Sequence, residues 1–189
     1  MANFKSSISK KILIIRLSSI GDIILTTALV RMISNQIPSC KLDFLTSKPF
    51  EEILKYNPHI EKIIQYDKSL PLKEIANKKI KLHGTYEKVI DLQNSFRSRH
   101  FRLGLSDKIF TVKKNRMNKL SLIYLKKPFL DSARPVPEIY LETVKELGIE
   151  DDGKGLELWL PGEEKQNEYP PDFRKSSKKN RIAIAPGAH

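Results

Sequence analysis

Short apolar runs alternate with segments of helical periodicity over the first 147 residues of the chain. The first run, residues 11–17, is continuous and rich in isoleucine, which is typical of a parallel strand buried on both faces. After a polar turn, apolar residues repeat with the spacing of one helix face at Ile24, Leu25, Ala28, Leu29, Met32 and Ile33. The expected strands are residues 11–17, 41–46, 62–66, 86–92 and 108–112, and the expected helices are residues 24–35, 50–56, 72–81, 98–105 and 138–147.

Strands that alternate with helices predict a parallel sheet with right-handed crossovers. The expected fold class is therefore α/β, a Rossmann-like parallel sheet with flanking helices. Residues 161–179 are rich in Pro, Glu and Lys and are typical of a linker. A new apolar run follows at residues 181–185. The expected organisation is thus a domain at residues 1–160, a linker at 161–179, and the first strand of a truncated second domain at 180–189.

Positive charge is concentrated in one segment of the chain. The 189 residues carry 34 Lys and Arg against 22 Asp and Glu, a net charge of +12. Residues 96–132 hold 10 basic and 2 acidic side chains, whereas residues 133–189 have a net charge of −2. Such a field attracts phosphates on nucleic acid, lipid or a small molecule. General lysine enrichment is the alternative, but it explains Arg97, Arg99 and Arg102 less well, because guanidinium groups suit bidentate phosphate contacts.

Composition excludes several classes of protein and site. Cys40 is the single cysteine, which excludes a disulfide framework and a cysteine-based zinc site. The four His residues lack metal-ligand spacing, so we expect no metal. No apolar run reaches the roughly 18–20 residues needed to span a bilayer, and the N-terminus lacks the apolar stretch of a signal peptide. We therefore expect a cytoplasmic protein.

Two of the expected strands end in unusually polar segments, and ligands of parallel α/β sheets bind beyond the carboxyl ends of strands. The first segment runs from Ser18 to Asp22, directly after the first strand. We expect Gly21 to permit a tight turn and the close approach of a ligand. Asp22 is a candidate proton acceptor, with helix capping as the alternative. A dinucleotide site is not indicated, because one glycine stands where the fingerprint needs three.

The second polar strand end is the segment from Asp91 to Arg99. It supplies amide, hydroxyl and guanidinium groups, from Gln93, Asn94, Ser95, Ser98, Arg97, Arg99 and the following Arg102. Such a cluster suits a phosphorylated sugar, because hydrogen-bond groups lie beside positive charge. The strand order of the sheet can bring this segment close to Asp22. A solvated helix N-terminus is the alternative.

Three segments resemble the ADP-heptose:lipopolysaccharide heptosyltransferases, glycosyltransferase family 9. Residues 12–28 (ILIIRLSSIGDIILTTA) resemble the opening of that family. Residues 86–99 (YEKVIDLQNSFRSR) resemble its strand-to-helix segment, and residues 181–188 (RIAIAPGA) resemble the first strand and turn of its second domain. The resemblance implies the GT-B architecture, in which two Rossmann-like domains face a cleft. This chain would then hold the N-terminal, acceptor-side domain, the linker and the first strand of the donor-binding domain.

The resemblance also implies roles for individual residues. Asp22 matches the general base that takes a proton from an acceptor hydroxyl during transfer with inversion. The residues that would shape the turn around it are Ser18, Ser19 and Gly21. The residues that would contact an anionic acceptor are Gln93, Asn94, Arg97 and Arg99. The residues that match the start of the phosphate-facing loop on the donor side are Gly187 and Ala188.

The same resemblance implies the partners. The donor would be a nucleotide-sugar, ADP-heptose, and the acceptor the lipopolysaccharide core or another anionic glycolipid. No further cofactor is implied. An acceptor of this kind places the protein at the inner face of the inner membrane, as a peripheral contact. Because the chain would lack most of the donor-binding domain, we expect it to be inactive alone.

A non-catalytic basic domain that binds anionic lipid or nucleic acid is the alternative function. The charge of residues 96–132 favours it. However, the sequence contains no RNP, KH or helix-turn-helix pattern, and aromatic residues do not interleave with the charges. Nucleic-acid binding is therefore not expected.

Overall fold

The computed structural model describes residues 10–67, 69, 72–113 and 134–161, and the structural statements below concern these residues. The chain divides into two units, residues 1–159 and 160–189. Residues 160 and 161 are the described part of the second unit. The rest of the predicted linker, the predicted strand at 181–185, and Gly187 and Ala188 lie outside the described residues, so the domain boundaries stay a prediction.

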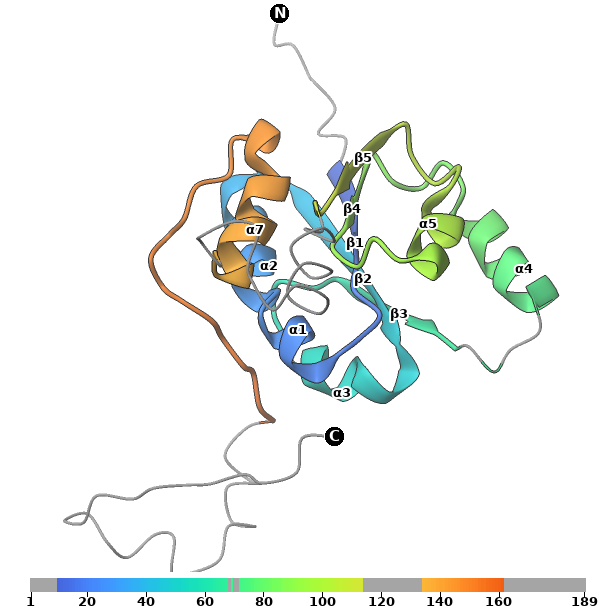
Figure 1. Cartoon of the computed structure of the whole chain (residues 1–189), viewed down its shortest axis with the longest axis horizontal. Helices are drawn as coiled ribbons and strands as arrows, with labels where there is room; N and C mark the ends of the chain where they lie inside the picture. Colours follow the sequence, from blue (N-terminus) through green and yellow to red (C-terminus); the bar gives the residue numbers. More distant parts are fainter. Residues whose placement is uncertain (1–9, 68, 70–71, 114–133, 162–189) are drawn as a thin grey trace, which may run out of the picture. The chain divides into compact units, whose positions relative to one another are not determined.

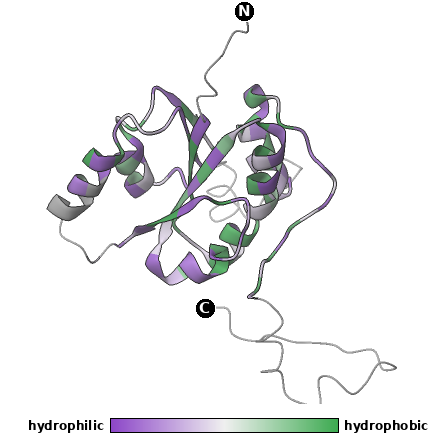
Figure 2. Ribbon diagram, turned by 180° about the vertical axis from the view of Figure 1, so that it is seen from behind, coloured by the Kyte–Doolittle hydropathy of each residue, from purple (hydrophilic) through white to green (hydrophobic). Residues whose placement is uncertain are grey.

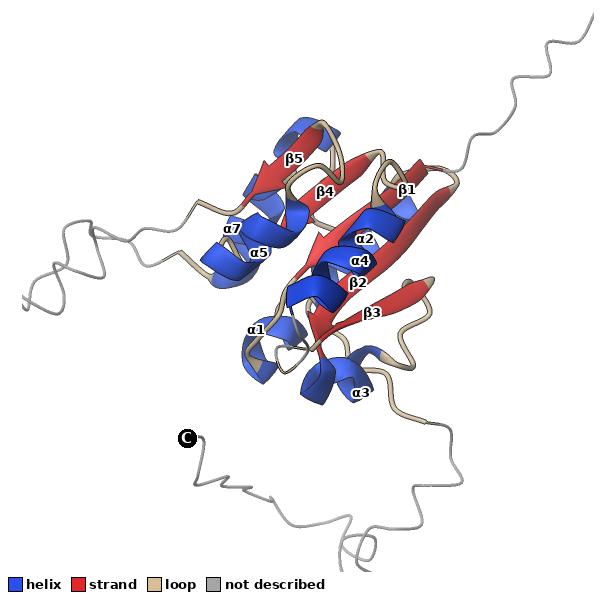
Figure 3. Cartoon of the chain, turned by 90° about the vertical axis from the view of Figure 1, so that its right-hand side faces the viewer, coloured by secondary structure: helices blue, strands red, loops and turns tan. Residues whose placement is uncertain are grey.

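Five parallel strands form one sheet in the order β3-β2-β1-β4-β5 (Figures 1 and 3). The strands are β1 (Lys10–Ile15), β2 (Cys40–Ser47), β3 (Lys62–Tyr66), β4 (Lys88–Asp91) and β5 (Lys108–Thr111). The predicted Rossmann-like α/β fold is thereby confirmed. The chain runs from β1 outward to β3 and then crosses back to β4. The strand order therefore reverses between β1 and β4, and ligands of such sheets bind at that point, beyond the carboxyl ends of the strands.

Helices cover both faces of the sheet. On one face, α2 (Thr27–Gln36), α3 (Glu51–Leu54) and α7 (Val136–Thr143) form a core with Ile12 and Ile14. On the other face, α5 (Phe96–Arg102) forms a core with Leu13 and Ile15, and α4 (Leu72–Leu82) lies on the same side (Figure 1). Successive residues of β1 thus enter opposite cores, as the two-residue period of a strand requires.

The positions of apolar and polar residues agree with a sheet covered by helices on both faces. The residues of β1 from Ile12 to Ile15 are fully buried, which confirms the prediction that this strand is covered on both faces. The flanking helices carry both apolar and polar residues, as Figure 2 shows by colour. Amphipathic helices bury one side on a sheet and leave the other in water, whereas α2 is buried along residues 27–33 because it packs against both the sheet and α7. Among the helices that the structure describes, none is long and apolar enough to cross a bilayer.

Two helices replace the single helix predicted for residues 24–35. The first, α1 (Ile20–Ile24), begins directly after Ser19, and α2 follows after a break at residues 25 and 26. The Thr26 hydroxyl lies within this break and donates a 2.6 Å hydrogen bond to the carbonyl oxygen of Ile23. Threonine hydroxyls that bond to a carbonyl of the preceding turn compete with the helical ladder, which accounts for the break.

The other predicted elements are present, β3 with the predicted ends and most of the rest with shifted ends. The helix expected at residues 98–105 is α5, which begins two residues earlier because Ser95 caps it. The Ser98 backbone nitrogen donates to Ser95 Oγ at 3.3 Å, and the Ser95 backbone nitrogen donates to Ser98 Oγ at 2.9 Å. The helix expected at residues 138–147 is α7 followed by a 3₁₀ turn, η2 (Lys145–Leu147). It ends at Gly148, whose φ of 72° is the left-handed conformation of a helix stop.

Two smaller differences concern β4 and the segment that follows β2. β4 spans residues 88–91 and is shorter than the strand predicted for residues 86–92. The helix predicted for residues 50–56 is split into a 3₁₀ turn, η1 (Lys48–Phe50), and the short α3. Proline at position 49, the second residue of η1, suits the start of such a turn, since its fixed φ is already helical.

The segment that follows α7 is anchored on α2, and one buried arginine makes the charged contacts. Arg31 donates two parallel hydrogen bonds of 2.8 Å to the carboxylate of Asp152, from Nε and Nη2. Its third nitrogen, Nη1, donates a 2.9 Å bond to Glu157. The Arg31 side chain is 7% exposed, so water screens these contacts little. Gln36 and Thr27 of the same helix add hydrogen bonds to the backbone of Glu150 and Glu157, so α2 holds a chain segment more than 110 positions away at several points.

Candidate functional site

The two predicted polar segments lie side by side at the carboxyl ends of β1 and β4. Ile15 is the register partner of Asp91, so the loops that leave these strands start next to each other. Gln93 joins the loops directly, because its Oε1 accepts hydrogen bonds from the backbone nitrogens of Leu17 (3.1 Å) and Ser18 (3.4 Å). The structure thus brings together the two halves of the candidate site that are some 70 residues apart in sequence.

Asp22 lies in the first turn of α1 with one carboxylate oxygen held and the other open. Its Oδ2 accepts hydrogen bonds from the Ser19 backbone nitrogen (3.2 Å) and the Ser19 hydroxyl (3.0 Å), and it forms an ion pair with Arg16. No hydrogen bond from the described residues reaches Oδ1, and 34% of the side chain is exposed. The bond from the Ser19 nitrogen is the capping contact that was the alternative for Asp22. It uses Oδ2 and leaves Oδ1 without a hydrogen bond from the described residues.

The environment of Asp22 keeps its carboxylate charged. Burial raises the pKa of Asp22, but the backbone hydrogen bond from Ser19 and the positive charge of Arg16 lower it by more. The pKa of Asp22 therefore lies below its ordinary value of 3.8. An ionised carboxylate at neutral pH is the form that accepts a proton, while the lowered pKa limits its strength as a base.

Gly21 is not in a tight turn, contrary to the prediction. It lies inside α1, and a Cβ placed on it would meet no atom within 4 Å. The prediction was wrong because the helix begins at Ile20, directly after its N-cap residue Ser19. The fold therefore has no conformational need for glycine here, and the close approach of a ligand to Gly21 stays a prediction.

Arg16 and Tyr140 belong to the site, and the sequence analysis assigned neither to it. Arg16 follows β1, and only 9% of its surface is exposed. Its guanidinium carbon lies 5.9 Å from the ring centre of Tyr140, a buried residue of α7. One signal was present in the sequence, because Arg16 is the single charged residue between Ile12 and Leu17. A charge within such an apolar run must find a partner when the run is buried.

Asp91 organises the loop after β4. This residue is fully buried, and its Oδ1 accepts hydrogen bonds from the backbone nitrogens of Gln93 (2.9 Å) and Asn94 (2.7 Å). Its Oδ2 forms an ion pair with Nη1 of Arg102 at 2.8 Å. The charge of Arg102 is thus paired inside the protein. Gln93 Oε1 is also occupied, because it accepts the two hydrogen bonds from the loop after β1. The Gln93 amide nitrogen has no hydrogen bond to the described residues.

The other residues that were predicted to contact an anionic acceptor differ in whether their polar groups already have partners within the protein. Asn94 has a φ of 41°, a left-handed conformation that asparagine tolerates. Its Oδ1 accepts a 2.8 Å bond from Nε of Arg99, and its amide nitrogen donates to the carbonyl oxygen of Val112. Arg97 is exposed and forms no hydrogen bond or ion pair with the described residues. Arg97 and Arg99, both in α5, are therefore the exposed positive groups that follow this loop, and Asn94 holds Arg99. Most of the basic segment, residues 114–132, lies outside the described residues.

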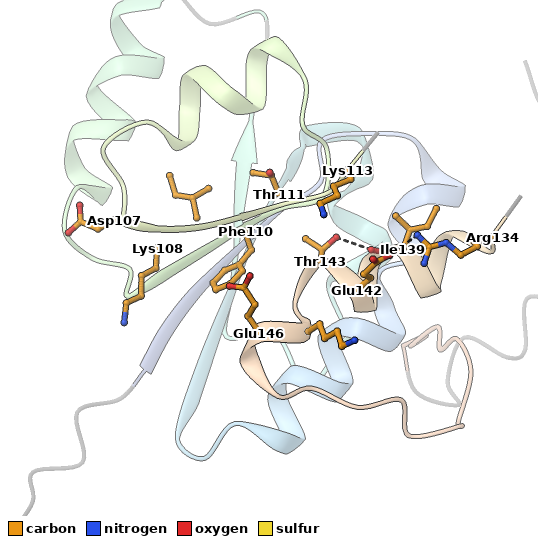
Figure 4. Close-up of a pocket in the computed structure, with 12 residues that line it drawn as sticks. Asp107, Lys108, Phe110, Thr111, Lys113, Arg134, Ile139, Glu142, Thr143 and Glu146 are labelled. Atoms are coloured by element: carbon orange, nitrogen blue, oxygen red, sulfur yellow. Dashed lines mark hydrogen bonds and ion pairs between the residues drawn. The ribbon is translucent and has the colours of Figure 1, made fainter. Parts of the chain in front are cut away.

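A groove of about 1120 Å³ lies elsewhere, between β5 and α7 (Figure 4). It is lined by Asp107, Lys108, Ile109, Phe110, Thr111, Lys113, Arg134, Ile139, Glu142, Thr143, Lys145 and Glu146. Acidic and basic side chains are mixed there, and Arg134 pairs with Glu142 at 2.7 Å. The groove therefore does not favour a ligand of one charge, and none of the predicted site residues lines it.

Solved structures of glycosyltransferases share this fold. A glycosyl transferase family 9 structure from Veillonella parvula DSM 2008 aligns with a TM-score of 0.66 and 20% identity, over 84% of this chain and 47% of that protein. The E. coli heptosyltransferase WaaC aligns with a TM-score of 0.58 in two structures. The one with ADP-2-deoxy-2-fluoro heptose is 23% identical, and the one with ADP is 25% identical. Both alignments cover 76% of this chain.

The alignments cover only part of each matched glycosyltransferase. The chain spans about half the length of the glycosyltransferases it matches. No protein-family model matches the sequence, and no curated protein matches it significantly. The resemblance found in the sequence is confirmed by structure neighbours: the chain has the fold of one half of the family 9 glycosyltransferases, heptosyltransferases among them.

Proposed function

We propose that this chain is the acceptor-side half of a family 9 glycosyltransferase that transfers a sugar, with inversion, from a nucleotide-sugar to an anionic glycolipid. The observation that carries the proposal is that Asp22 follows β1 where the strand order reverses, on a loop that Gln93 joins to the end of β4. Arg97 and Arg99 follow that end of β4 in α5. The shared fold with glycosyltransferases of this family supports it. Because the chain spans about half of those proteins, we expect transfer only when the nucleotide-sugar-binding half is present.

The proposed chemistry assigns Asp22 the role of general base. A hydroxyl oxygen of the acceptor forms a bond to the anomeric carbon, while the bond from that carbon to the diphosphate breaks on the opposite face. Asp22 Oδ1 takes the hydroxyl proton, and the nucleoside diphosphate leaves with the bonding electrons. A placed carboxylate accelerates such an attack by about 10²–10⁴-fold. The developing charge on the diphosphate needs positive groups or a helix N-terminus, which we assign to the other half.

The proposed donor is ADP-heptose, because structure neighbours were solved with ADP and with a fluorinated ADP-heptose. The proposed acceptor is the lipopolysaccharide core or a similar phosphorylated glycolipid. Arg97 and Arg99 provide exposed guanidinium groups for its phosphates, since such groups bind phosphate in bidentate fashion. An acceptor anchored in a bilayer brings the protein to the inner face of the membrane as a peripheral contact.

Transfer by the joined halves tests this function. The chain is fused to, or mixed with, the nucleotide-sugar-binding half of a family 9 enzyme and supplied with ADP-heptose and a lipopolysaccharide inner-core acceptor. We expect a glycosylated product whose anomeric configuration is the inverse of the donor's, and no product from either half alone. A product with retained configuration contradicts the mechanism. No transfer and no acceptor binding by this chain contradicts the function.

A further inference from the structure

Arg16 connects the two loops of the candidate site through all three of its nitrogens. Its Nε donates a 2.7 Å hydrogen bond to the carbonyl oxygen of Ser18, in the loop after β1. Its Nη1 donates a 2.6 Å bond to the carbonyl oxygen of Leu92, directly after β4. Its Nη2 forms the ion pair with Oδ2 of Asp22. One planar group thus touches the ends of both strands and the candidate base.

This arrangement needs a guanidinium group. Arg16 is nine-tenths buried, so each of its nitrogens must be satisfied inside the protein. A planar fork with several donors reaches three acceptors at once, whereas a lysine ammonium is a compact point charge on a flexible stem. The ring of Tyr140 lies against the guanidinium group and limits its movement. The position of Arg16 is therefore determined by four groups from three parts of the chain.

The orientation of Asp22 follows from these contacts. Arg16 and Ser19 both bind Oδ2, so the carboxylate is held from one side. Rotation of the carboxylate would break three interactions at once, which keeps Oδ1 turned away from them. Ser19 belongs to the same turn as Asp22, whereas Arg16 is the contact that ties the carboxylate to β4.

We infer that Arg16 is a positioning residue for the proposed base: it ties Asp22 to the end of β4 through the carbonyl of Leu92 and leaves Oδ1 free for the acceptor proton. The inference rests on the proposed function for the role of Asp22, but its geometry does not. Within the described part of the chain, the titratable groups that face Asp22 are Arg16 from the loop and Tyr140 from α7. Tyr140 is neutral at physiological pH, because burial raises the pKa of its hydroxyl above the ordinary value of 10. Arg16 is therefore the charge that acts on Asp22.

Carboxyl ¹³C NMR titration of Asp22 in the 189-residue chain tests the inference without any transfer reaction. In Arg16→Gln, the titration midpoint of Asp22 is expected to move to higher pH, because the attractive charge is removed while burial remains. The matched control is Arg97→Gln, which removes an exposed arginine from the same edge of the sheet and should leave the midpoint where it is. An unchanged midpoint in Arg16→Gln, or equal shifts in both variants, overturns the inference.

A second measurement uses the unaltered protein, in case Arg16→Gln does not fold. The ¹H–¹⁵N signal of Arg16 Nε is expected to move with the same midpoint as the Asp22 carboxyl, since the two groups share an ion pair. Separate midpoints overturn the inference. Both readouts are independent of catalysis. A positive titration with no sugar transfer by the joined halves would therefore retain the positioning role and refute only the proposed function, and the reverse result would refute only the role of Arg16.

Discussion

Gln93 Oε1 accepts a hydrogen bond of 3.1 Å from the backbone nitrogen of Leu17, so a side chain that follows β4 holds the loop that follows β1. The same oxygen also accepts a bond from Ser18. Together with the contact of Arg16 to the carbonyl of Leu92, this joins the two strand ends in both directions. The candidate site is thus one connected unit rather than two loops that happen to be close.

Removal of the Gln93 side chain should loosen the loop that carries Ser18. We expect Gln93→Ala to lower the free energy of unfolding by about 1 kcal/mol, because two backbone donors lose their acceptor. Gln93→Glu keeps an acceptor oxygen at the same place and is the matched control. Urea unfolding gives the stability, and amide hydrogen exchange at Leu17 gives the local effect. Equal protection of Leu17 in the wild type and in Gln93→Ala would show that the bond does not hold the loop.

Gly21→Ala separates a structural role for this glycine from a role in ligand binding. A Cβ at this position meets no atom, and alanine favours a helix over glycine by about 0.5–1 kcal/mol. We therefore expect stability to stay equal or to rise. Acceptor binding and transfer by the joined halves should fall, because the methyl group enters the space that the acceptor needs. Unchanged acceptor affinity would mean that no ligand passes close to Gly21.

The pair formed by Arg31 and Asp152 should make stability depend on pH in strong acid. Hydrogen bonds from Arg31 lower the pKa of Asp152 from 3.8 to about 2, against the opposing effect of burial. The Asp152 carboxyl therefore binds a proton less readily in the folded state than in the unfolded state. The stability that the ion pair contributes is fully present above about pH 4 and is lost as the pH falls toward 2. Asp152→Asn should remove this part of the pH dependence of the unfolding free energy.

Truncation of Arg31 tests the same anchor from the other side. Arg31→Met should lower the free energy of unfolding by about 3 kcal/mol, because two carboxylates lose their partner in a poorly hydrated place. Lys41→Met is the control, since Lys41 forms an exposed pair with Glu61 and its loss should leave the unfolding midpoint unchanged. Similar effects of the two substitutions would contradict the anchoring role of Arg31.

Replacement of Arg97 and Arg99 tests whether the acceptor meets this edge of the sheet. We expect Arg97→Ala with Arg99→Ala to weaken binding of a phosphorylated glycolipid about tenfold or more, since charged hydrogen bonds to phosphate are lost. The control replaces Lys62 and Lys108, which begin β3 and β5 at the opposite edge and remove the same charge. Titration calorimetry gives both Kd values. Equal weakening in the two double variants would indicate a diffuse electrostatic attraction.

The sheet was predictable from the sequence because short apolar runs mark its strands. The run from Ile12 to Ile15 is typical of a strand covered on both faces, and β3 was predicted with its observed ends. Helix starts were predicted less well, since they depend on local caps. Ser19 starts α1 ahead of Gly21, and Ser95 starts α5 ahead of its apolar face.

The chemistry of the site was predictable only in part. Asp22 and the arginines after β4 stand out by residue type, but the partners of each depend on register. Gln93 meets Leu17 because β1 and β4 are neighbours in the sheet, a relation that no local pattern contains. The prediction placed Arg16 in the first strand and assigned it no partner. A buried charge needs an opposite charge, and for Arg16 this is the carboxylate of Asp22.

Sugar transfer by the joined halves with Asp22→Asn tests the central claim most directly. Asparagine keeps an oxygen that can accept the hydrogen bonds of Ser19, so the turn should persist while the proton acceptor is lost. The measured quantities are kcat for transfer and Kd for the acceptor. The account predicts that kcat falls about 10²–10⁴-fold while the acceptor Kd changes little. A kcat equal to that of the unaltered protein would contradict the assignment of Asp22 as the base.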